Sequence, residues 1–402
     1  MKTLSHSAHS PLVVSRRVLS GAVLSAMLAM SAPAWTQQAP AAPAAAQPAA
    51  PAPAAAGAVA VGDVSAVPAP TIAAKAWIVI DVNSGQTLAA SNADMKVEPA
   101  SLTKIMTAYL TFDALRSGRL KLTDTVVVSE LAHEQAPSKI GLPVGHEITV
   151  DVAIRALVIK SANDVAIMLA EKIGGSQDDF VRLMNDTAKR LGMTRTHFVN
   201  ANGLPVAGQM STARDLATLS LAVLREFPEH NALWGMPEFR LGKLRLRSHN
   251  SLLRSFEGAD GLKTGFICDS GFNVVASATR DGTRLIAVVL GEPSGKDRTL
   301  RAASLLEHGF ETTTWKTALG APTLDKLPMD PAARPLQSVR SSVTAWACNP
   351  HTAARKVTRR KPRGTAAKKR PHTRDATASK AKSGRKSVTI MVPAAKSAKG
   401  TP

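Results

Sequence analysis

Three short motifs in this chain carry the residue types needed for acyl transfer through a serine hydroxyl. In chain order they read Ser101-Leu102-Thr103-Lys104, Ser161-Ala162-Asn163 and Lys263-Thr264-Gly265. Together they supply a nucleophile with a lysine base three residues away, a second hydroxyl that can relay a proton, and a segment that can bind an anion. The sequence therefore predicts chemistry that passes through a covalent acyl-enzyme.

Each motif taken alone has an ordinary structural explanation. Ser101 could cap a helix beside a solvated Lys104, since serine is common at helix starts. Lys263 could protect the edge of a sheet. The motifs are, however, separated by 60 and 102 residues, and each falls on the kind of element that its role requires. Their joint occurrence favours the catalytic interpretation.

The elements around the first two motifs are predicted from the spacing of apolar residues. A helix is expected over 101–117, because apolar side chains recur there at helical intervals. Lys104 then lies on the same face as Ser101, whose place at the helix start favours negative charge. The second motif follows an apolar segment and precedes a helix expected over 165–173.

Strands at the two ends of the same region are predicted to form one antiparallel sheet. Apolar and alternating runs indicate strands over 76–82, 87–91, 272–280 and 283–290. The dipeptide Asp281-Gly282 between the last two is a strong hairpin signal. The expected fold class is therefore α+β, with an antiparallel sheet flanked by helices from the middle of the chain.

Composition divides the 402 residues into four parts. We expect a signal peptide over 1–34, an Ala/Pro-rich linker over 35–70, a catalytic domain over 71–318, and a basic, disordered tail over 319–402. The net charge of +20 is uneven, because residues 351–402 carry sixteen Lys or Arg against one acid. The high isoelectric point therefore describes the tail and not the domain.

The first 34 residues have the parts of a secretory signal. Arg16-Arg17 precede an apolar run of 13 residues, and Ala32 and Ala34 form a small-residue cleavage site. A membrane-spanning helix needs about 20 apolar residues, so cleavage is favoured over retention as an uncleaved anchor. The expected location is outside the cytoplasm, in the periplasm or at the membrane periphery of the cell envelope.

The cysteines and histidines give no sign of a metal or cofactor. Cys268 lies in a predicted strand and Cys348 in the predicted tail, so a structural disulfide between them is not expected. No Cys/His cluster has metal-ligand spacing, and none of the ten histidines accompanies a Gly-x-Ser-x-Gly turn. Zinc hydrolases and α/β-hydrolases are therefore disfavoured, and no cofactor is expected.

With these motifs in place, the chain closely resembles the low-molecular-mass penicillin-binding proteins that act as serine-type D-Ala-D-Ala carboxypeptidases. The resemblance covers about residues 72–315 and extends beyond the motifs to their flanks, in Pro99 to Thr107, Lys160 to Glu171, Gly192 to Leu204 and Gly261 to Gly265. It implies a β-lactamase/transpeptidase-like fold, in which a helical subdomain packs on the sheet and the active site lies in the cleft between them.

The resemblance implies the catalytic roles. Ser101 would attack the carbonyl between two terminal D-alanines, and Lys104 would accept its proton. Lys104 can do so only when neutral, and both burial and the charge of Lys263 would lower its pKa. Ser161 would pass the proton to the leaving amine, while Asn163 would hold Lys104 and bind the substrate amide.

Substrate binding is implied in the same way. Lys263 and Thr264 would bind the terminal carboxylate, with Gly265 next to them in the strand. The N–H groups of Ser101 and Phe266 would stabilise the oxyanion, and Arg298 would be a second carboxylate ligand. Phe266 departs from the histidine that some relatives carry, which puts substrate preference in doubt. The tail also lacks the amphipathic anchoring helix with which many relatives end.

Three alternatives share some of these features. A D,D-endopeptidase or a β-lactamase would use the same fold. A class A β-lactamase also needs a glutamate that activates the deacylating water, and we find no convincing glutamate-bearing loop between the second and third motifs. A non-catalytic wall-binding protein driven by the tail is the third. The expected partners are peptidoglycan stem peptides, β-lactam antibiotics as covalent inhibitors and, for the tail, anionic wall polymers or lipid headgroups. Nucleic acid is not expected, because the tail has few aromatic residues to stack on bases.

Overall fold

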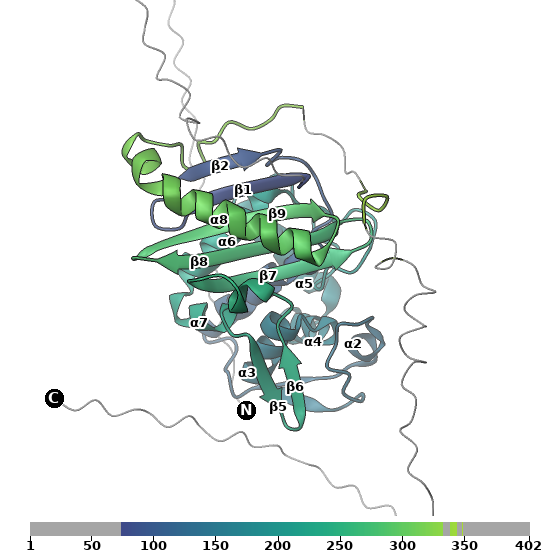
Figure 1. Cartoon of the computed structure of the whole chain (residues 1–402). Helices are drawn as coiled ribbons and strands as arrows, with labels where there is room; N and C mark the ends of the chain where they lie inside the picture. The colour runs from purple at the N-terminus through teal and green to yellow at the C-terminus, as the bar shows by residue number, and fades with distance from the viewer. Residues whose placement is uncertain (1–73, 333–337, 344–347, 349–402) are drawn as a thin grey trace, which may run out of the picture. The chain divides into compact units, whose positions relative to one another are not determined.

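Five antiparallel strands form the central sheet, in the order β2-β1-β9-β8-β7 (Figure 1). Their bounds are β1 Ala76–Asp81, β2 Thr87–Ser91, β7 Ala259–Ile267, β8 Gly271–Arg280 and β9 Thr283–Glu292. Two small antiparallel pairs accompany the sheet, β3 Thr125–Val127 with β4 Glu147–Thr149, and β5 Glu238–Leu241 with β6 Leu244–Arg247. The chain thus brings its first and last strands together, which confirms the predicted sheet.

The computed structural model describes residues 74–332, 338–343 and 348. The predicted signal peptide, the linker and the basic segment after residue 348 lie outside these residues. Helices fill the middle of the chain, as expected for an α+β protein. They are α1 Lys104–Arg116, α2 Glu130–Glu134, α3 Val150–Arg155, α4 Asn163–Gly174, α5 Gln177–Arg190, α6 Ala213–Glu226, α7 Asn231–Trp234 and α8 Gly295–Ala318. Short helical turns are η1 Ala100–Thr103, η2 Ala156–Lys160, η3 Pro228–His230 and η4 Ser251–Arg254.

The sheet separates two apolar cores, because alternate side chains of a strand point to opposite faces. On one face Ile78 and Ile80 pack with the helical subdomain, which includes α1, α4 and α6. On the other face Val79 packs beneath α8, with Leu305 and Leu306. Figure 1 shows α8 crossing the outer face of the sheet. The site-bearing strand β7 is left at the edge, next to η1 and the helices behind it.

The hairpin between β8 and β9 forms as the sequence predicts. Asp281 and Gly282 both have positive φ angles, of 48° and 77°, which a tight two-residue turn between twisted strands requires. The predicted helix over 101–117 is also present in most of its length. It begins differently, since residues 100–103 form a 3-10 turn before α1.

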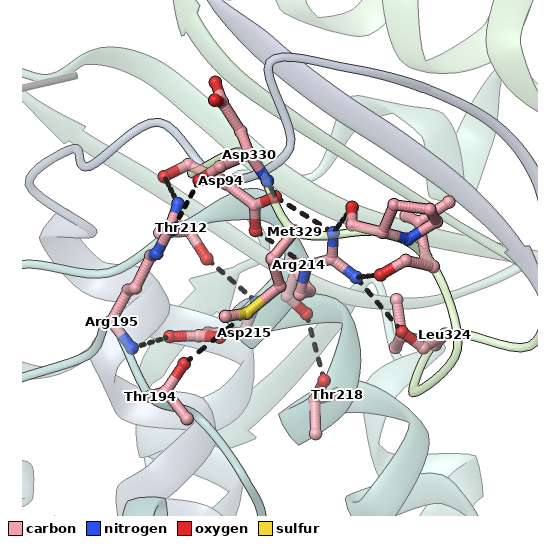
Figure 2. Close-up of polar contacts among 12 residues, drawn as sticks. Asp94, Thr194, Arg195, Thr212, Arg214, Asp215, Thr218, Leu324, Met329 and Asp330 are labelled. Carbon is pink, nitrogen blue, oxygen red and sulfur yellow. Dashed lines mark hydrogen bonds and ion pairs between the residues drawn. The ribbon is translucent and has the colours of Figure 1, made fainter. Parts of the chain in front are cut away.

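The predicted start of the disordered tail at residue 319 is too early. Residues after α8 fold back onto the domain, where Leu324 N–H donates to Gly85 O at 2.9 Å. Arg214 donates to the carbonyl oxygens of Leu324, Leu327 and Pro328 at 3.1, 2.9 and 2.8 Å (Figure 2). Composition did not predict that this segment is ordered, because its contacts with the domain are made mainly by backbone groups, which every sequence carries.

The expectation that the two cysteines stay unpaired is wrong. Cys268 and Cys348 form a disulfide that closes a sequence separation of 80 residues. The segment before Cys348 brings the two cysteines close together. In this segment Val339 is buried, and its N–H donates to Asp269 O at 2.8 Å. Ser338 also donates to the Asp269 carboxylate at 2.7 Å. The segment 338–343 and Cys348 therefore attach the end of the described chain to the turn between β7 and β8.

Among the residues that the structure describes, no helix combines the length and the apolar character needed to cross a membrane.

Candidate active site

Ser101 and Lys104 meet where η1 turns into α1. Lys104 Nζ lies 3.0 Å from Ser101 Oγ, because three residues along a helical turn bring two side chains to one face. Ala100 has a positive φ of 49°, an unusual conformation for a non-glycine residue that sets the direction of the chain into the serine. The first motif therefore places the hydroxyl and the amine in hydrogen-bonding contact.

Lys104 is buried, with 1% of its surface exposed. Its amine also contacts two oxygens at 2.6 Å, Asn163 Oδ1 and the backbone oxygen of Asn202. Burial lowers the pKa of Lys104 well below its usual value, and the nearby charge of Lys263 lowers it further, while Asp164 acts in the opposite direction. The environment thus favours the neutral amine.

The second motif lies between η2 and α4. Ser161 adopts a left-handed conformation with φ 61°, and its Oγ accepts a hydrogen bond from Lys263 Nζ at 2.7 Å. Asn163 begins α4 and is fixed from its other side, since its Nδ2 donates to Ala136 O at 2.7 Å. One amide side chain therefore links Lys104 to the loop after α2.

The third motif lies on the edge strand β7. A Cβ atom at Gly265 would come 2.9 Å from Pro99 O and 3.2 Å from the backbone nitrogen of Ser101, so only glycine lets the strand approach the nucleophile this closely. Lys263 is buried, and burial together with the charge of Arg298 lowers its pKa to about 7. The three motifs therefore meet at one place.

A cavity of about 370 Å³ opens at this meeting point. Its walls come from all three motifs and from five further segments of the chain. The lining residues are Ser101, Pro137, Ser138, Ser161, Asn163, Gly203, Leu204, His249, Thr264, Gly265, Phe266, Ile267, Phe272 and Arg298. The buried amines Lys104 and Lys263 lie directly behind these walls, in hydrogen-bonding contact with Ser101 and Ser161.

The cavity has a strongly cationic side. Arg298, on the first turn of α8, donates to the backbone oxygen of His249 at 3.2 Å, and burial lowers its pKa to about 10. His249 lies at the cavity mouth, and its pKa is lowered to about 4 by burial and then by the charges of Lys263, Lys160, Arg298 and Lys104. Such a site favours an anionic ligand group.

Sequence reasoning missed several residues of the site. Asn202 contributes a backbone oxygen to Lys104, and Gly203 has φ 80° with Ala100 packed where a side chain would be. Ser138 and Phe272 also line the cavity. Only the Asn202-Gly203 pair carried a signal, that of a tight turn. The others are brought to the site by tertiary structure alone.

No group of three or more His, Cys, Asp or Glu side chains is placed to hold a metal ion in the part of the chain that the structure describes.

Comparisons with known proteins agree with this geometry. Residues 63–294 match the family described as D-alanyl-D-alanine carboxypeptidase. The chain is 43% identical over 258 residues to the D-alanyl-D-alanine carboxypeptidase DacC of Escherichia coli, which covers 62% of this chain and 64% of that protein. The chain thus spans a little under two thirds of the length of this curated relative.

Solved structures show the same likeness. Penicillin binding protein 5 from Haemophilus influenzae superposes with a TM-score of 0.59 and 36% identity, covering 60% of this chain and 72% of that one. The ampicillin-bound form of penicillin-binding protein D2 from Listeria monocytogenes gives a TM-score of 0.56 and 33% identity, covering 60% of this chain and all of that one. Since the family match extends over more than half of the 402 residues, the chain belongs to the D-alanyl-D-alanine carboxypeptidase family.

Proposed function

We propose that the protein removes the terminal D-alanine from peptidoglycan stem peptides that end in D-Ala-D-Ala. The observation that carries this proposal is the contact between Ser101 Oγ and Lys104 Nζ at 3.0 Å, in a cavity with a cationic side. A neutral lysine amine has two N–H groups and one lone pair. Asn163 Oδ1 and Asn202 O, both at 2.6 Å, take up the two N–H groups. The lone pair is then free to accept the serine proton.

Acylation follows from this arrangement. Ser101 Oγ bonds to the carbonyl carbon of the penultimate D-alanine while its proton moves to Lys104 Nζ. The carbon–nitrogen bond to the terminal D-alanine then breaks, and the leaving nitrogen receives a proton through Ser161 Oγ. Backbone N–H groups of Ser101 and Phe266 stabilise the oxyanion that forms in between. D-Alanine departs, and the shortened peptide stays bound to Ser101 as an ester.

Deacylation reverses the proton transfers. Water attacks the ester carbonyl, Lys104 accepts a proton from that water, and Ser101 Oγ recovers a proton as the ester bond breaks. The released products are free D-alanine and a stem peptide one residue shorter. Each proton that leaves a hydroxyl or a water returns to a leaving group, so the enzyme ends in its starting state.

The cationic side explains why a free carboxylate is recognised. Lys263, Thr264 and Arg298 present two charges and a hydroxyl on one side of the serine. A terminal carboxylate is paired there, whereas a mid-chain amide would leave Lys263 and Arg298 with only neutral partners, the oxygens of Ser161, Thr264 and His249. This favours a carboxypeptidase over a D,D-endopeptidase. β-Lactam antibiotics, which carry a carboxylate beside a reactive amide, would acylate Ser101 in the same way.

We further propose that the protein works outside the cytoplasm, in the cell envelope. Two independent features support this location. The N-terminal segment has the basic, apolar and small-residue parts of a secretory signal. The Cys268–Cys348 disulfide is a bond that persists in oxidising compartments and is rare in the cytosol.

Ser101→Ala tests the proposed activity. The wild-type protein is expected to release D-alanine from a diacetyl-lysyl-D-Ala-D-Ala peptide and to bind a fluorescent penicillin covalently. The variant should lose both while keeping its thermal unfolding transition. Ser255→Ala, on the exposed residue that follows η4, serves as the matched control and should behave as wild type. Covalent labelling that survives in Ser101→Ala would show that the nucleophile is a different residue.

A further inference from the structure

Two phenylalanines of the cavity wall form a pair that core packing does not explain. Phe266 on β7 lies directly opposite Phe272 on β8, and their rings stack with centroids 4.1 Å apart and planes 29° apart. Both residues line the cavity and are partly exposed, as is Ile267. None of the three belongs to either apolar core formed by the described residues. Their apolar surface is therefore available to a ligand.

The order of residues along β7 places this pair relative to the reaction. Gly265 lies against the backbone of Ser101. Thr264, on the carboxylate-binding side, comes before it, and Phe266 comes after it. Thr264 and Phe266 point to the same face, since alternate residues of a strand do so. A substrate whose carboxylate is held by Lys263 and Thr264 therefore directs its acyl-donor part toward Phe266.

The pair is held in place from behind. The Phe272 ring lies 3.6 Å from the position that a Cβ of Gly295 would take at the start of α8. Val339 and Cys348, near the end of the described chain, hold the turn that joins the two phenylalanines. An aromatic surface that is already ordered loses little conformational entropy when a ligand covers it.

We propose that Phe266 and Phe272, together with Ile267, form an apolar subsite that selects acyl donors with an uncharged, apolar or aromatic side group. This inference rests on the proposed function and adds the substrate class to it. Among the described residues that line the cavity none is acidic, and the cations there are Arg298 and, behind the wall, Lys263. A free amine on the donor therefore finds no counter-charge there, whereas an acylated amine finds two aromatic faces.

Two matched ligand pairs test the subsite. The first is a penicillin with a phenylacetyl group against the same nucleus with a bare amine, measured as the second-order rate constant for acylation. The second is a lysyl-D-Ala-D-Ala peptide with an acetylated side-chain amine against the same peptide with a free amine, measured as kcat/KM. The wild-type protein should prefer the uncharged member of each pair.

Phe266→Ala and Phe272→Ala should each slow acylation by the phenylacetyl penicillin by about 10- to 100-fold, a loss typical of emptying an apolar subsite. In Phe272→Ala, which leaves the oxyanion-binding residues untouched, acylation by the bare-amine nucleus should change by less than about threefold, since it does not reach the pair. Phe266→Leu, which keeps apolar bulk, should retain most of the preference. Because acylation by the bare-amine nucleus reports on a folded site, misfolding would be visible as a loss with both ligands.

The matched control is Phe256→Ala, a partly buried phenylalanine that packs under α8 outside the cavity. It should leave both ratios unchanged. Equal losses for both members of each pair, in Phe266 and Phe272 variants that keep the wild-type thermal unfolding transition, would overturn the subsite. A wild-type protein that neither reacts with penicillin nor releases D-alanine would instead overturn the proposed function, so the two failures are distinct.

Discussion

In the proposed mechanism, the two buried lysine amines at this site have opposite tasks. Lys104 must be neutral to accept a proton, while Lys263 must be charged to bind a carboxylate. Burial lowers both pKa values, but Lys104 also has Lys263 as a cationic neighbour. Lys263 keeps a pKa of about 7, and an arriving carboxylate raises it by favouring the charged form. Substrate binding therefore holds the charge on Lys263, which in turn keeps Lys104 neutral.

This coupling predicts the alkaline limb of the pH profile. In the free enzyme Lys263 loses its proton as the pH rises through about 7, so carboxylate binding weakens above that pH. The ratio kcat/KM reports the free enzyme and kcat the bound complex. We therefore expect kcat/KM for a peptide to fall above about pH 7, while kcat holds to higher pH. Steady-state kinetics between pH 5 and pH 10 would check this.

Two variants identify the group responsible for that limb. Arg298→Met removes a cation that lowers the pKa of Lys263, so the limb should move to higher pH even as KM rises. Lys263→Arg keeps its charge throughout this range, so the limb should disappear. A limb that stays at the same pH in both variants would assign it to another residue.

The sequence predicted Ser101, Lys104 and Lys263 as site residues from their types and spacing. The structure places them close together, and their catalytic roles stay a prediction. Ser101, Lys104 and Lys263 have no substitutes of similar reactivity, so their spacing could be read directly. Asn202 acts through its backbone oxygen and Phe272 through its position opposite Phe266. A backbone group has no sequence signature, and the pairing of two strands is set by the fold. These residues required the structure.

An ion pair between Arg214 and Asp94 holds the segment that leads to η1 (Figure 2). Arg214, on the first turn of α6, donates to both carboxylate oxygens of Asp94 at 2.6 and 2.9 Å. Asp94 lies in the segment that leads to η1, and the backbone of Val97 in this segment pairs with Ser211. The same guanidinium holds the returning segment 324–330. One side chain thus joins three separate parts of the chain.

Arg214→Met should destabilise the protein strongly. Arg214 and Asp94 are both at least nine-tenths buried, and removing one partner leaves an unpaired buried carboxylate, which costs about 3–5 kcal/mol. The measurement is the free energy of unfolding in denaturant. Arg182→Met, which breaks an exposed helical pair with Asp179, is the matched control and should change this free energy very little. Equal effects in the two variants would contradict the assigned role.

The disulfide should contribute to stability through the long loop that it closes. Closing a loop of this size constrains the unfolded chain, and loss of a native disulfide costs about 2–5 kcal/mol. Cys348→Ser should therefore lower the unfolding midpoint. A reductant should lower the wild-type midpoint to the same extent and leave the variant unchanged. A wild-type midpoint that does not respond to full reduction would show that contacts such as those of Val339 are sufficient.

At the scale of elements, strands and hairpin turns were predictable, because the spacing of apolar residues and the residue types that turns require depend only on neighbours in the sequence. The runs over 76–82 and 283–290 alternate or are wholly apolar, and Asp281-Gly282 fits only a tight turn. The returning segment 319–332 was not predictable. It has little apolar periodicity, and its place depends on Arg214, which lies more than a hundred residues away in sequence.

At the scale of the whole molecule, the excess of basic residues lies in a different part of the sequence from the candidate catalytic residues. Residues 351–402 carry sixteen of the fifty Lys and Arg, with a single acid, and they follow directly on Cys348, which is bonded to the turn beside Phe266 and Phe272. We propose that the cations of this basic segment attract anionic polymers by releasing counterions, which would make such binding dependent on salt.

Two truncations separate the basic segment from the folded domain. A chain that ends at Cys348 keeps the disulfide and all carbonyl acceptors of Arg214, so it should retain wild-type turnover of a soluble D-Ala-D-Ala peptide and wild-type stability. It should lose salt-sensitive binding to isolated cell walls, measured by co-sedimentation over a range of salt concentrations. A chain that ends at residue 320 should instead lose stability, because Arg214 loses its carbonyl acceptors after that residue and Cys268 loses its disulfide partner. Wall binding that survives removal of the basic segment would place the wall-binding surface on the catalytic domain.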